Sequence, residues 1–244
     1  MTRIACHIVS LVLFGTSITA VAEVIEPIIT EESLPEAAGE CNLRMSATYH
    51  ADVFEPATAL PRAQLFCGFS RRWGGEIDVP LAREEGRYGV ASAAVAVKYK
   101  LRGETSHIPA LVLGMEAKFP TGQGESGVEA GPFIAVFKQV HGLSLQGNIG
   151  LGLRHSGRER EYLRAYNGAV AIPLRHTGFA LVGEVNAESS RSGTMRAFSP
   201  GVHYSLGKNR YVAFAWPISA SQGSARAGLV FLFQTRVRGG EAAD

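Results

Sequence analysis

Apolar and polar residues alternate with a period of two along most of the chain after residue 41. The clearest stretch covers residues 143–154. Its apolar side chains share one face and its polar side chains share the other: Leu143, Leu145, Ile149, Leu151 and Leu153 against Ser144, Gln146, Asn148 and Arg154. A helix would scatter these residues around its axis, whereas a strand separates them cleanly. The pattern therefore predicts a β-strand.

About twelve such segments follow one another. The pattern recurs at 111–119, 179–188 and 227–237, although Val230 and Leu232 interrupt the polar face of the last. The expected strands are 41–54, 60–70, 74–81, 88–101, 108–119, 129–140, 143–154, 161–174, 177–188, 196–206, 210–219 and 225–237. Most are longer than an ordinary strand of about five or six residues. They suit a tilted strand that crosses a bilayer, which needs about nine to eleven residues.

The connections between the segments alternate in length. Tight turns are expected at 141–142, 175–176 and 207–209, and longer polar loops at 120–128, 156–160 and 189–195. Short turns on one rim and longer loops on the other are typical of outer-membrane barrels. We therefore predict an all-β fold, an antiparallel up-and-down transmembrane β-barrel of about twelve strands, with ten as the alternative. The barrel is expected to cover 41–237.

The strands of a soluble antiparallel barrel or sandwich also alternate apolar and polar residues, with the apolar face turned toward a core. Two features besides strand length favour an apolar face that meets lipid. The polar faces carry Gly, Ser, Asn, Gln and paired charges, which suit a wet lumen. Aromatic residues lie near the ends of the expected strands, as an interfacial girdle would require: Tyr88, Phe119, Tyr162 and Trp216.

The polar faces supply the candidate lumen-lining residues: Glu116, Lys118, Gln146, Asn148, Arg154, Glu184, Asn186 and Glu188. In an open barrel they would line a pore, and their mixed charges predict little ion preference. In a closed barrel they would form a hydrogen-bonded, ion-paired plug. For twelve strands we favour a narrow, partly filled lumen.

The ends of the chain differ from the barrel segments. Residues 1–22 contain Arg3, an apolar run and a small-residue cleavage site before Glu23, which predicts a secretory signal peptide. Residues 23–40 form an acidic, proline-containing periplasmic segment that is expected to be extended rather than packed. Residues 238–244 form a C-terminal tail. After cleavage only Cys41 and Cys67 remain, and a disulfide or two unpaired cysteines are both open.

Composition narrows the class of protein. The 244 residues include 28 glycines, and 24 basic against 22 acidic residues give a net charge of +2. This balance lacks the basic field that nucleic-acid binding requires. A mean hydropathy of +0.06 excludes a polytopic helical membrane protein.

Catalytic motifs are weak. The sequence holds no pattern typical of a hydrolase, a zinc protease or a phosphate-binding loop, and its seven histidines are scattered, so we expect no metal and no cofactor. His203 and Ser205 share a strand face, as a barrel lipase would need, but no acidic partner or oxyanion hole can be located. Gly122 and Gly124 lack the strand-to-helix context of a phosphate loop.

Residues 108–122, IPALVLGMEAKFPTG, resemble the central motif of the MetA-pathway of phenol degradation family, in which a strand runs into Pro120, Thr121 and Gly122. The runs LSLQGNIGLGLRH at 143–155 and FSPGVHYSLGKNRYVAFAWPIS at 198–219 are similar to that family in style. The resemblance covers roughly residues 85–235. It implies an outer-membrane channel for aromatic or other small hydrophobic compounds. The chain departs from that family's pattern in two ways. Its N-terminal third matches poorly, and it does not end on an aromatic residue.

These observations predict a passive, porin-like channel in the outer membrane of a Gram-negative cell. Its partners would be outer-membrane lipid, a small-molecule solute and, during biogenesis, the barrel-assembly machinery. The alternatives are an outer-membrane barrel enzyme that acts on lipid and a non-conducting structural barrel.

Overall fold

The computed structural model describes residues 34–51, 58–84, 87–121, 127–157, 159–175, 177–191, 193–207, 210–221 and 224–238. The predicted signal peptide, most of the acidic segment and residues 239–244 of the tail lie outside this part of the chain. Strands make up nearly all of the described residues. None of the described segments forms a helix long and apolar enough to cross a membrane.

The strands follow the alternating segments of the sequence closely. They are β1 (Cys41–Ala51), β2 (Thr58–Gly68), β3 (Trp73–Glu84), β4 (Arg87–Val90), β5 (Ser92–Arg102), β6 (Ala110–Pro120), β7 (Val128–Val140), β8 (Leu143–Ser156), β9 (Glu159–Pro173), β10 (Phe179–Ser190), β11 (Gly193–Gly207), β12 (Arg210–Ala215), β13 (Ile218–Ser221) and β14 (Ser224–Arg238).

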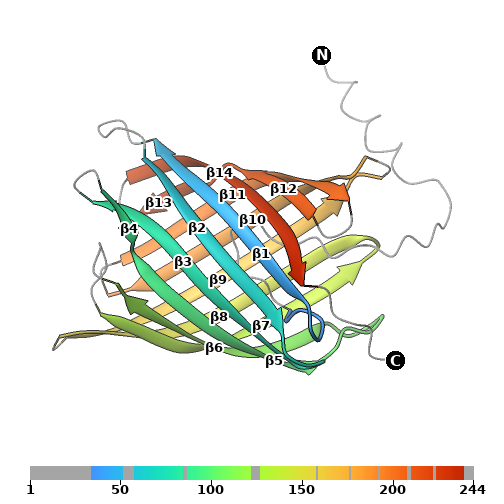
Figure 1. Cartoon of the computed structure of the whole chain (residues 1–244), viewed down its shortest axis with the longest axis horizontal. Coiled ribbons are helices and arrows are strands. Elements are labelled where there is room, and N and C mark those ends of the chain that lie inside the picture. The colour runs from blue at the N-terminus through green and yellow to red at the C-terminus, as the bar shows by residue number, and fades with distance from the viewer. Residues whose placement is uncertain are drawn as a thin grey trace, which may run out of the picture.

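The sheet closes on itself. Each wall strand pairs antiparallel with the next, and β14 returns to pair with β1 from Cys41↔Arg238 to Ala51↔Ala227. Because β4 continues into β5, and β12 and β13 share one place between β11 and β14, the wall has twelve strands. Figure 1 shows the tilted strands and the first strand beside the last. The predicted twelve-stranded barrel is confirmed and the ten-stranded alternative is wrong.

The barrel has two rims. At one, here called the terminal rim, β1 begins at Cys41 and β14 ends at Arg238. The opposite rim is called the distal rim. Long loops were expected at 156–160 and 189–195, both at the distal rim, but β8 runs to Ser156, β9 starts at Glu159, β10 runs to Ser190 and β11 starts at Gly193. The polar residues there continue the strands instead, because the cross-strand pairing Ser156↔Glu159 and Ser190↔Gly193 extends to the hairpin ends.

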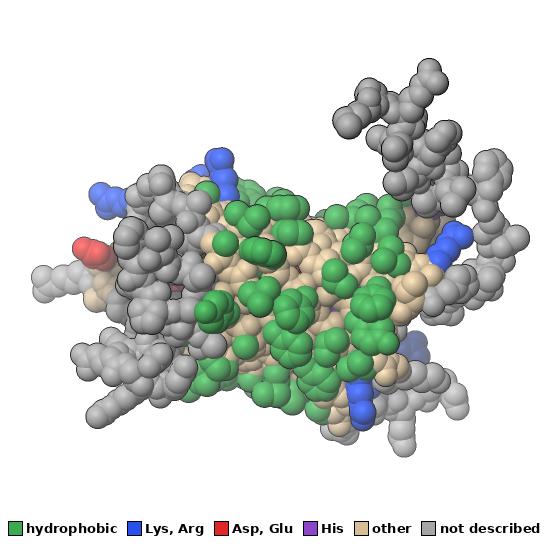
Figure 2. All heavy atoms as spheres, turned by 90° about the horizontal axis from the view of Figure 1, so that it is seen from above, with side chains coloured by type: hydrophobic (Ala, Val, Ile, Leu, Met, Phe, Trp, Pro, Cys, Tyr) green, Lys and Arg blue, Asp and Glu red, His purple; other side chains and the backbone are tan. Residues whose placement is uncertain are grey.

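Alternate residues of each strand face in opposite directions, as the sequence predicts. Along β5, Ala94, Ala96 and Lys98 are buried, whereas Val95 and Val97 are exposed. Exposed apolar side chains on the outer wall recur on the other strands, and Figure 2 shows them covering the middle of one face, with Lys and Arg at its two ends. The outer surface therefore carries the apolar belt that a lipid bilayer requires.

The inner face is less polar than the pattern suggests. A buried cluster inside the barrel consists of Ala171, Val182, Ala213, Ala215, Val230 and Leu232, with Tyr211 packed against it. Val230 and Leu232 therefore do not break the alternation of β14. They hold inward positions, and the neighbouring strand β12 and the more distant β10 also present inward apolar side chains to this cluster.

Aromatic residues mark the terminal rim more clearly than the sequence showed. Trp73 and Tyr99 lie together with ring centroids 4.6 Å apart, and Phe179 and Tyr204 lie 4.4 Å apart. Of the aromatic residues expected in the girdle, Phe119 and Tyr162 are exposed near the distal rim. Trp216 was misplaced: it lies in the break between β12 and β13, midway along the wall.

Residues 34–40 are packed, contrary to the expectation of an unpacked segment. The backbone N–H of Gly39 donates to the Gly68 carbonyl at 2.8 Å, and Leu34 packs against Val112, Phe133 and Ala135 of the inner wall. A Cβ on Gly68 would lie 2.1 Å from the carbonyl oxygen of Ala37, so this close approach requires glycine. Cys41 and Cys67, paired across β1 and β2, form a disulfide at the base of the segment.

Candidate functional site in the barrel lumen

Near the terminal rim, inward side chains of six strands form a buried group that we call the sealed cluster. It consists of Arg44, Gln64, Phe66, Glu76, Lys98, Tyr211 and Gln234. Lys98 Nζ lies 3.0 Å from Glu76 Oε2, and these two side chains are only 3% and 6% exposed. Gln64 Nε2 donates to Glu76 Oε1 at 3.1 Å. The carboxylate of Glu76 is thus held on both oxygens.

The second cation of the sealed cluster is held differently. Arg44 Nε donates to Gln234 Oε1 at 2.8 Å, and the Tyr211 hydroxyl donates to the same oxygen at 2.7 Å. The Arg44 guanidinium carbon and Lys98 Nζ lie 4.8 and 5.5 Å from the centre of the Phe66 ring. Ion pair, amide contacts and cation–π contacts together compensate for burying charge in a site removed from water.

A second group of charges lies near the distal rim, on the inner faces of β6 to β9. We call it the open cluster: Glu116, Lys118, Glu129, Arg154 and Glu161. Arg154 and Lys118 both contact Glu129, with N–O distances of 2.8 and 3.7 Å. Lys118 and Arg154 are 39% and 36% exposed, so solvent reaches these cations.

The structure brings several predicted lumen residues into one place. A small interior cavity of about 90 Å³ is lined by Glu116, Lys118, Asn148 and Glu188, among others. Arg154 joins it through Glu129. Asn167 on β9 donates to Asn148 at 2.5 Å across the cavity wall. Gln146, Glu184 and Asn186 also face inward but lie outside the cavity lining, and Glu184 is 1% exposed.

The sequence missed the sealed cluster entirely. Arg44, Glu76 and Lys98 lie on the first wall strands, where the alternation is weakest. The one available indication was that each is a charged residue at the inward position of a strand, as Lys98 is between Val97 and Tyr99.

Residues 34–40 close the terminal rim over the sealed cluster. Asn42 Nδ2 donates to Glu36 Oε1 at 2.8 Å, and Arg236 pairs with Glu40 at 2.8 Å. Pro35 approaches Gly74 on the inner face of β3. The segment is therefore anchored to strands on both sides of the β1–β14 seam.

The remaining candidates lie apart from the two clusters or outside the described residues. His203 is buried with its ring 4.0 Å from Tyr211, and Ser205 Oγ donates to the Gly207 carbonyl at 3.4 Å. Pro120 ends β6, and Thr121 Oγ1 donates to the Val90 carbonyl; Gly122 and Gly124 lie outside the described part. Among the described residues no three side chains are grouped to hold a metal.

Solved structures share this architecture. The chain is similar to a KdgM porin (TM-score 0.60, 10% identity, covering 80% of this chain and 98% of that one). It is similar to a NanC porin structure (TM-score 0.59, 12% identity, covering 79% of this chain and 98% of that one). It is also similar to the COG4313 outer membrane channel from Pseudomonas putida F1 (TM-score 0.63, 9% identity, covering 86% of this chain and 100% of that one).

These similarities define the class: the chain has the fold of outer-membrane β-barrel porins and channels. At such low identity they show the fold alone. No family model and no curated protein matches the chain, so the resemblance to the phenol degradation family remains a prediction.

Proposed function

We propose that this protein is a passive outer-membrane channel for small molecules, with the terminal rim in the periplasm and the distal rim outside the cell. The observation that carries the proposal is the division of the wall into an apolar outer belt and an inner face with charged side chains of both signs. Such a wall is stable only when lipid lies outside and water reaches the inside.

Within this channel the open cluster forms the entrance. Its cations are more than a third exposed, and the cavity that it lines lies among strands near the distal rim. A solute that enters there meets paired charges of both signs, which lower the cost of losing water without binding one ion tightly.

The terminal rim forms the constriction. The sealed cluster and residues 34–40 fill the inner face there, which limits passage to small solutes. Leu34 of this segment packs on Val112, Phe133 and Ala135 of the inner wall. The solute class that we propose, small aromatic or hydrophobic compounds, is taken from the sequence resemblance.

The proposed location follows from the outer-membrane channels that share the fold. The partners are outer-membrane lipid at the apolar belt, the solute in the lumen and the barrel-assembly machinery during insertion. The mechanism is diffusion, without a covalent step. The arrangement of His203 and Ser205 gives no support to an enzyme that acts on lipid.

Reconstitution tests the proposal. The full-length protein, refolded until it migrates as a heat-modifiable band, is inserted into liposomes, and swelling is recorded with small sugars and with phenol-sized compounds. We expect swelling that falls steeply with solute size. Liposomes that carry the unrefolded protein are the control.

The outcomes separate the alternatives. A folded, inserted barrel that gives neither swelling nor conductance in planar bilayers would contradict the channel and support a structural barrel. Release of acyl chains from the liposome lipid would contradict it in favour of an enzyme. Recovery of the native protein in a soluble periplasmic fraction would contradict the location as well.

A further inference from the structure

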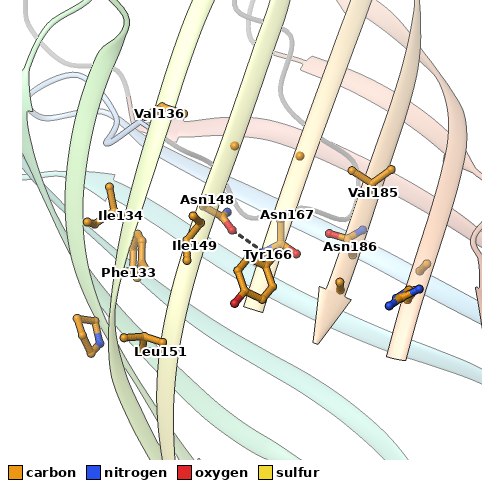
Figure 3. A pocket seen from close by; sticks show the side chains of 16 residues that line it. Phe133, Ile134, Val136, Asn148, Ile149, Leu151, Tyr166, Asn167, Val185 and Asn186 are labelled. Atoms are coloured by element: carbon orange, nitrogen blue, oxygen red, sulfur yellow. Dashed lines mark hydrogen bonds between the residues drawn. The ribbon is translucent and has the colours of Figure 1, made fainter. Parts of the chain in front are cut away.

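The outer wall carries a groove over β7 to β10. It has a volume of about 810 Å³ and is lined by Ile134, Val136, Ile149, Leu151, Tyr166 and Val185, all on outward positions. Figure 3 shows these side chains on neighbouring strands, which are paired from β7 to β10. The floor is Gly147 and Gly168, which are cross-strand partners, so two adjacent positions of the outer wall lack side chains.

One end of the groove is basic. Arg196 on β11 lies in its lining, and the pairing series Ile149↔Tyr166, Tyr166↔Ala187 and Ala187↔Arg196 connects it to the apolar side chains. Arg196 is the fourth residue of β11, which starts at the distal rim. The groove thus leads from the middle of the wall toward the proposed outer leaflet.

A second outward arginine, Arg164, lies beside the groove on β9, in register with Thr194 rather than with Arg196. Along β9 the inward Leu163 is buried, so the outward positions are Arg160, Tyr162, Arg164 and Tyr166, each exposed. Arg164 pairs with Leu151 of the groove lining and with Ser189. It is two strands from Arg196, about 10 Å in the direction of the ladder hydrogen bonds. Between them lie the hydroxyls of Ser189 and Thr194, 3.1 Å apart.

The described strands around these arginines carry no outward negative charge. Within strands β6 to β11 every Asp and Glu occupies an inward position: Glu116, Glu129, Glu159, Glu161, Glu184 and Glu188. A second copy of this chain would therefore bring no carboxylate from these strands to meet Arg164 and Arg196. Cations beside a bilayer instead attract anionic lipid headgroups.

We propose that the groove binds one phosphorylated, multiply acylated lipid of the lipid A type, with an acyl chain over Gly147 and Gly168 and a phosphate between Arg164 and Arg196. Apolar side chains contact the chain, and Ser189 and Thr194 provide further hydrogen-bond donors to the headgroup. Tyr162 and Tyr166 alternate with the arginines, as aromatic residues do at a membrane interface. The inference rests on the proposed membrane location but not on conduction.

Native mass spectrometry of the refolded full chain in detergent tests the site, with diphosphorylated lipid A and its dephosphorylated form as probes. We expect a one-to-one adduct with the phosphorylated lipid and about a tenfold weaker one with the dephosphorylated lipid, as expected when two cations contact the phosphate. The double variant R164Q/R196Q is expected to weaken the adduct about tenfold. R210Q is the matched control, because Arg210 is an exposed arginine at the terminal rim.

A second variant tests the acyl part of the site. A Cβ on Gly147 would make only ordinary contacts at 3.6 Å, so G147L is expected to fold while its side chain fills the groove. It should weaken binding of phosphorylated lipid A without any change to the arginines. Heat-modifiable migration of each variant confirms folding.

Equal binding of the two lipids, or equal binding by wild type and R164Q/R196Q, would overturn the proposal. If wild type is a dimer and G147L is a monomer that still binds the lipid, the groove belongs to a second copy of the chain. That result would overturn the proposal too. Solute flux is measured separately in liposomes without lipid A. Flux without an adduct contradicts only this inference, and an adduct without flux contradicts only the channel.

Discussion

The sealed cluster and the open cluster contain the same kinds of residue in opposite surroundings. Glu76 and Lys98 are 6% and 3% exposed, whereas Glu129 and Arg154 are 18% and 36% exposed. Both pairs have short N–O distances, 3.0 and 2.8 Å. The role of an ion pair in this barrel therefore depends on its access to water and not on its N–O distance.

The consequence for energetics is direct. Charges withdrawn from water depend on each other, because removal of one leaves the other desolvated and unpaired. Charges that remain solvated lose little when a partner is removed. The terminal end of the lumen is therefore expected to be rigid and structural, and the distal end to be adaptable and in contact with solute.

The largest effect is expected from Glu76→Ala. It removes the carboxylate that pairs with the buried Lys98 and should lower the free energy of unfolding by about 3–5 kcal/mol. The matched control, Glu129→Ala in the open cluster, should cost about 1 kcal/mol or less. Urea unfolding in lipid vesicles, followed by tryptophan fluorescence, measures both, and equal losses would contradict the comparison.

Next is Gly68→Ala. The new Cβ would collide with the Ala37 carbonyl oxygen, 2.1 Å away, and so displace residues 34–40 from the terminal rim. We expect single-channel conductance to rise by about twofold as the constriction widens. Gly183→Ala is the control, because Gly183 faces outward and its Cβ would meet Val170 at an ordinary 3.6 Å. If G68A conducts like wild type, the segment is not the constriction.

A smaller change is expected from K118Q/R154Q. Loss of two exposed cations leaves Glu116, Glu129 and Glu161 in excess at the entrance, so cation permeability relative to anion permeability should rise by about twofold. Reversal potentials in a salt gradient give this ratio. R210Q removes an outward arginine and should leave the permeability ratio unchanged. Equal ratios for K118Q/R154Q and R210Q would argue against an entrance at the open cluster.

The smallest effect is expected from Asn148→Ala. It removes the hydrogen bond from Asn167 in a cavity that water can enter, at a cost of about 1 kcal/mol. Urea unfolding should show this small shift with conductance intact. A loss as large as that of E76A would mean that the distal cavity is as tightly packed as the terminal end.

The sequence was sufficient to predict most of the strands, and the faces of those that alternate clearly. Alternation is a local property, so 143–154 showed directly that Leu145 and Ile149 oppose Gln146 and Asn148. It was also sufficient for the strand count, since each tight turn ends one segment and starts the next.

Contacts between segments far apart in the chain could not be predicted in the same way. Arg44 meets Gln234 only because the barrel closes between β1 and β14, 190 residues apart in the chain. Leu34 meets Phe133 because residues 34–40 enter the barrel. The outward arginines were missed for another reason: 161–174 was recognised as a strand, but its faces were not assigned, so Arg164 was not placed on the lipid side.

Access of a charged thiol reagent tests the central claim most directly. Cysteine is introduced at Lys118 in the open cluster or at Ser144, an inward residue 3% exposed at the terminal end of β8. Single-channel conductance is recorded while a negatively charged methanethiosulfonate is added. The account predicts that K118C is modified and partly blocked at least about tenfold faster than S144C. Equal rates in the two variants, or a folded barrel that passes no current, would contradict it.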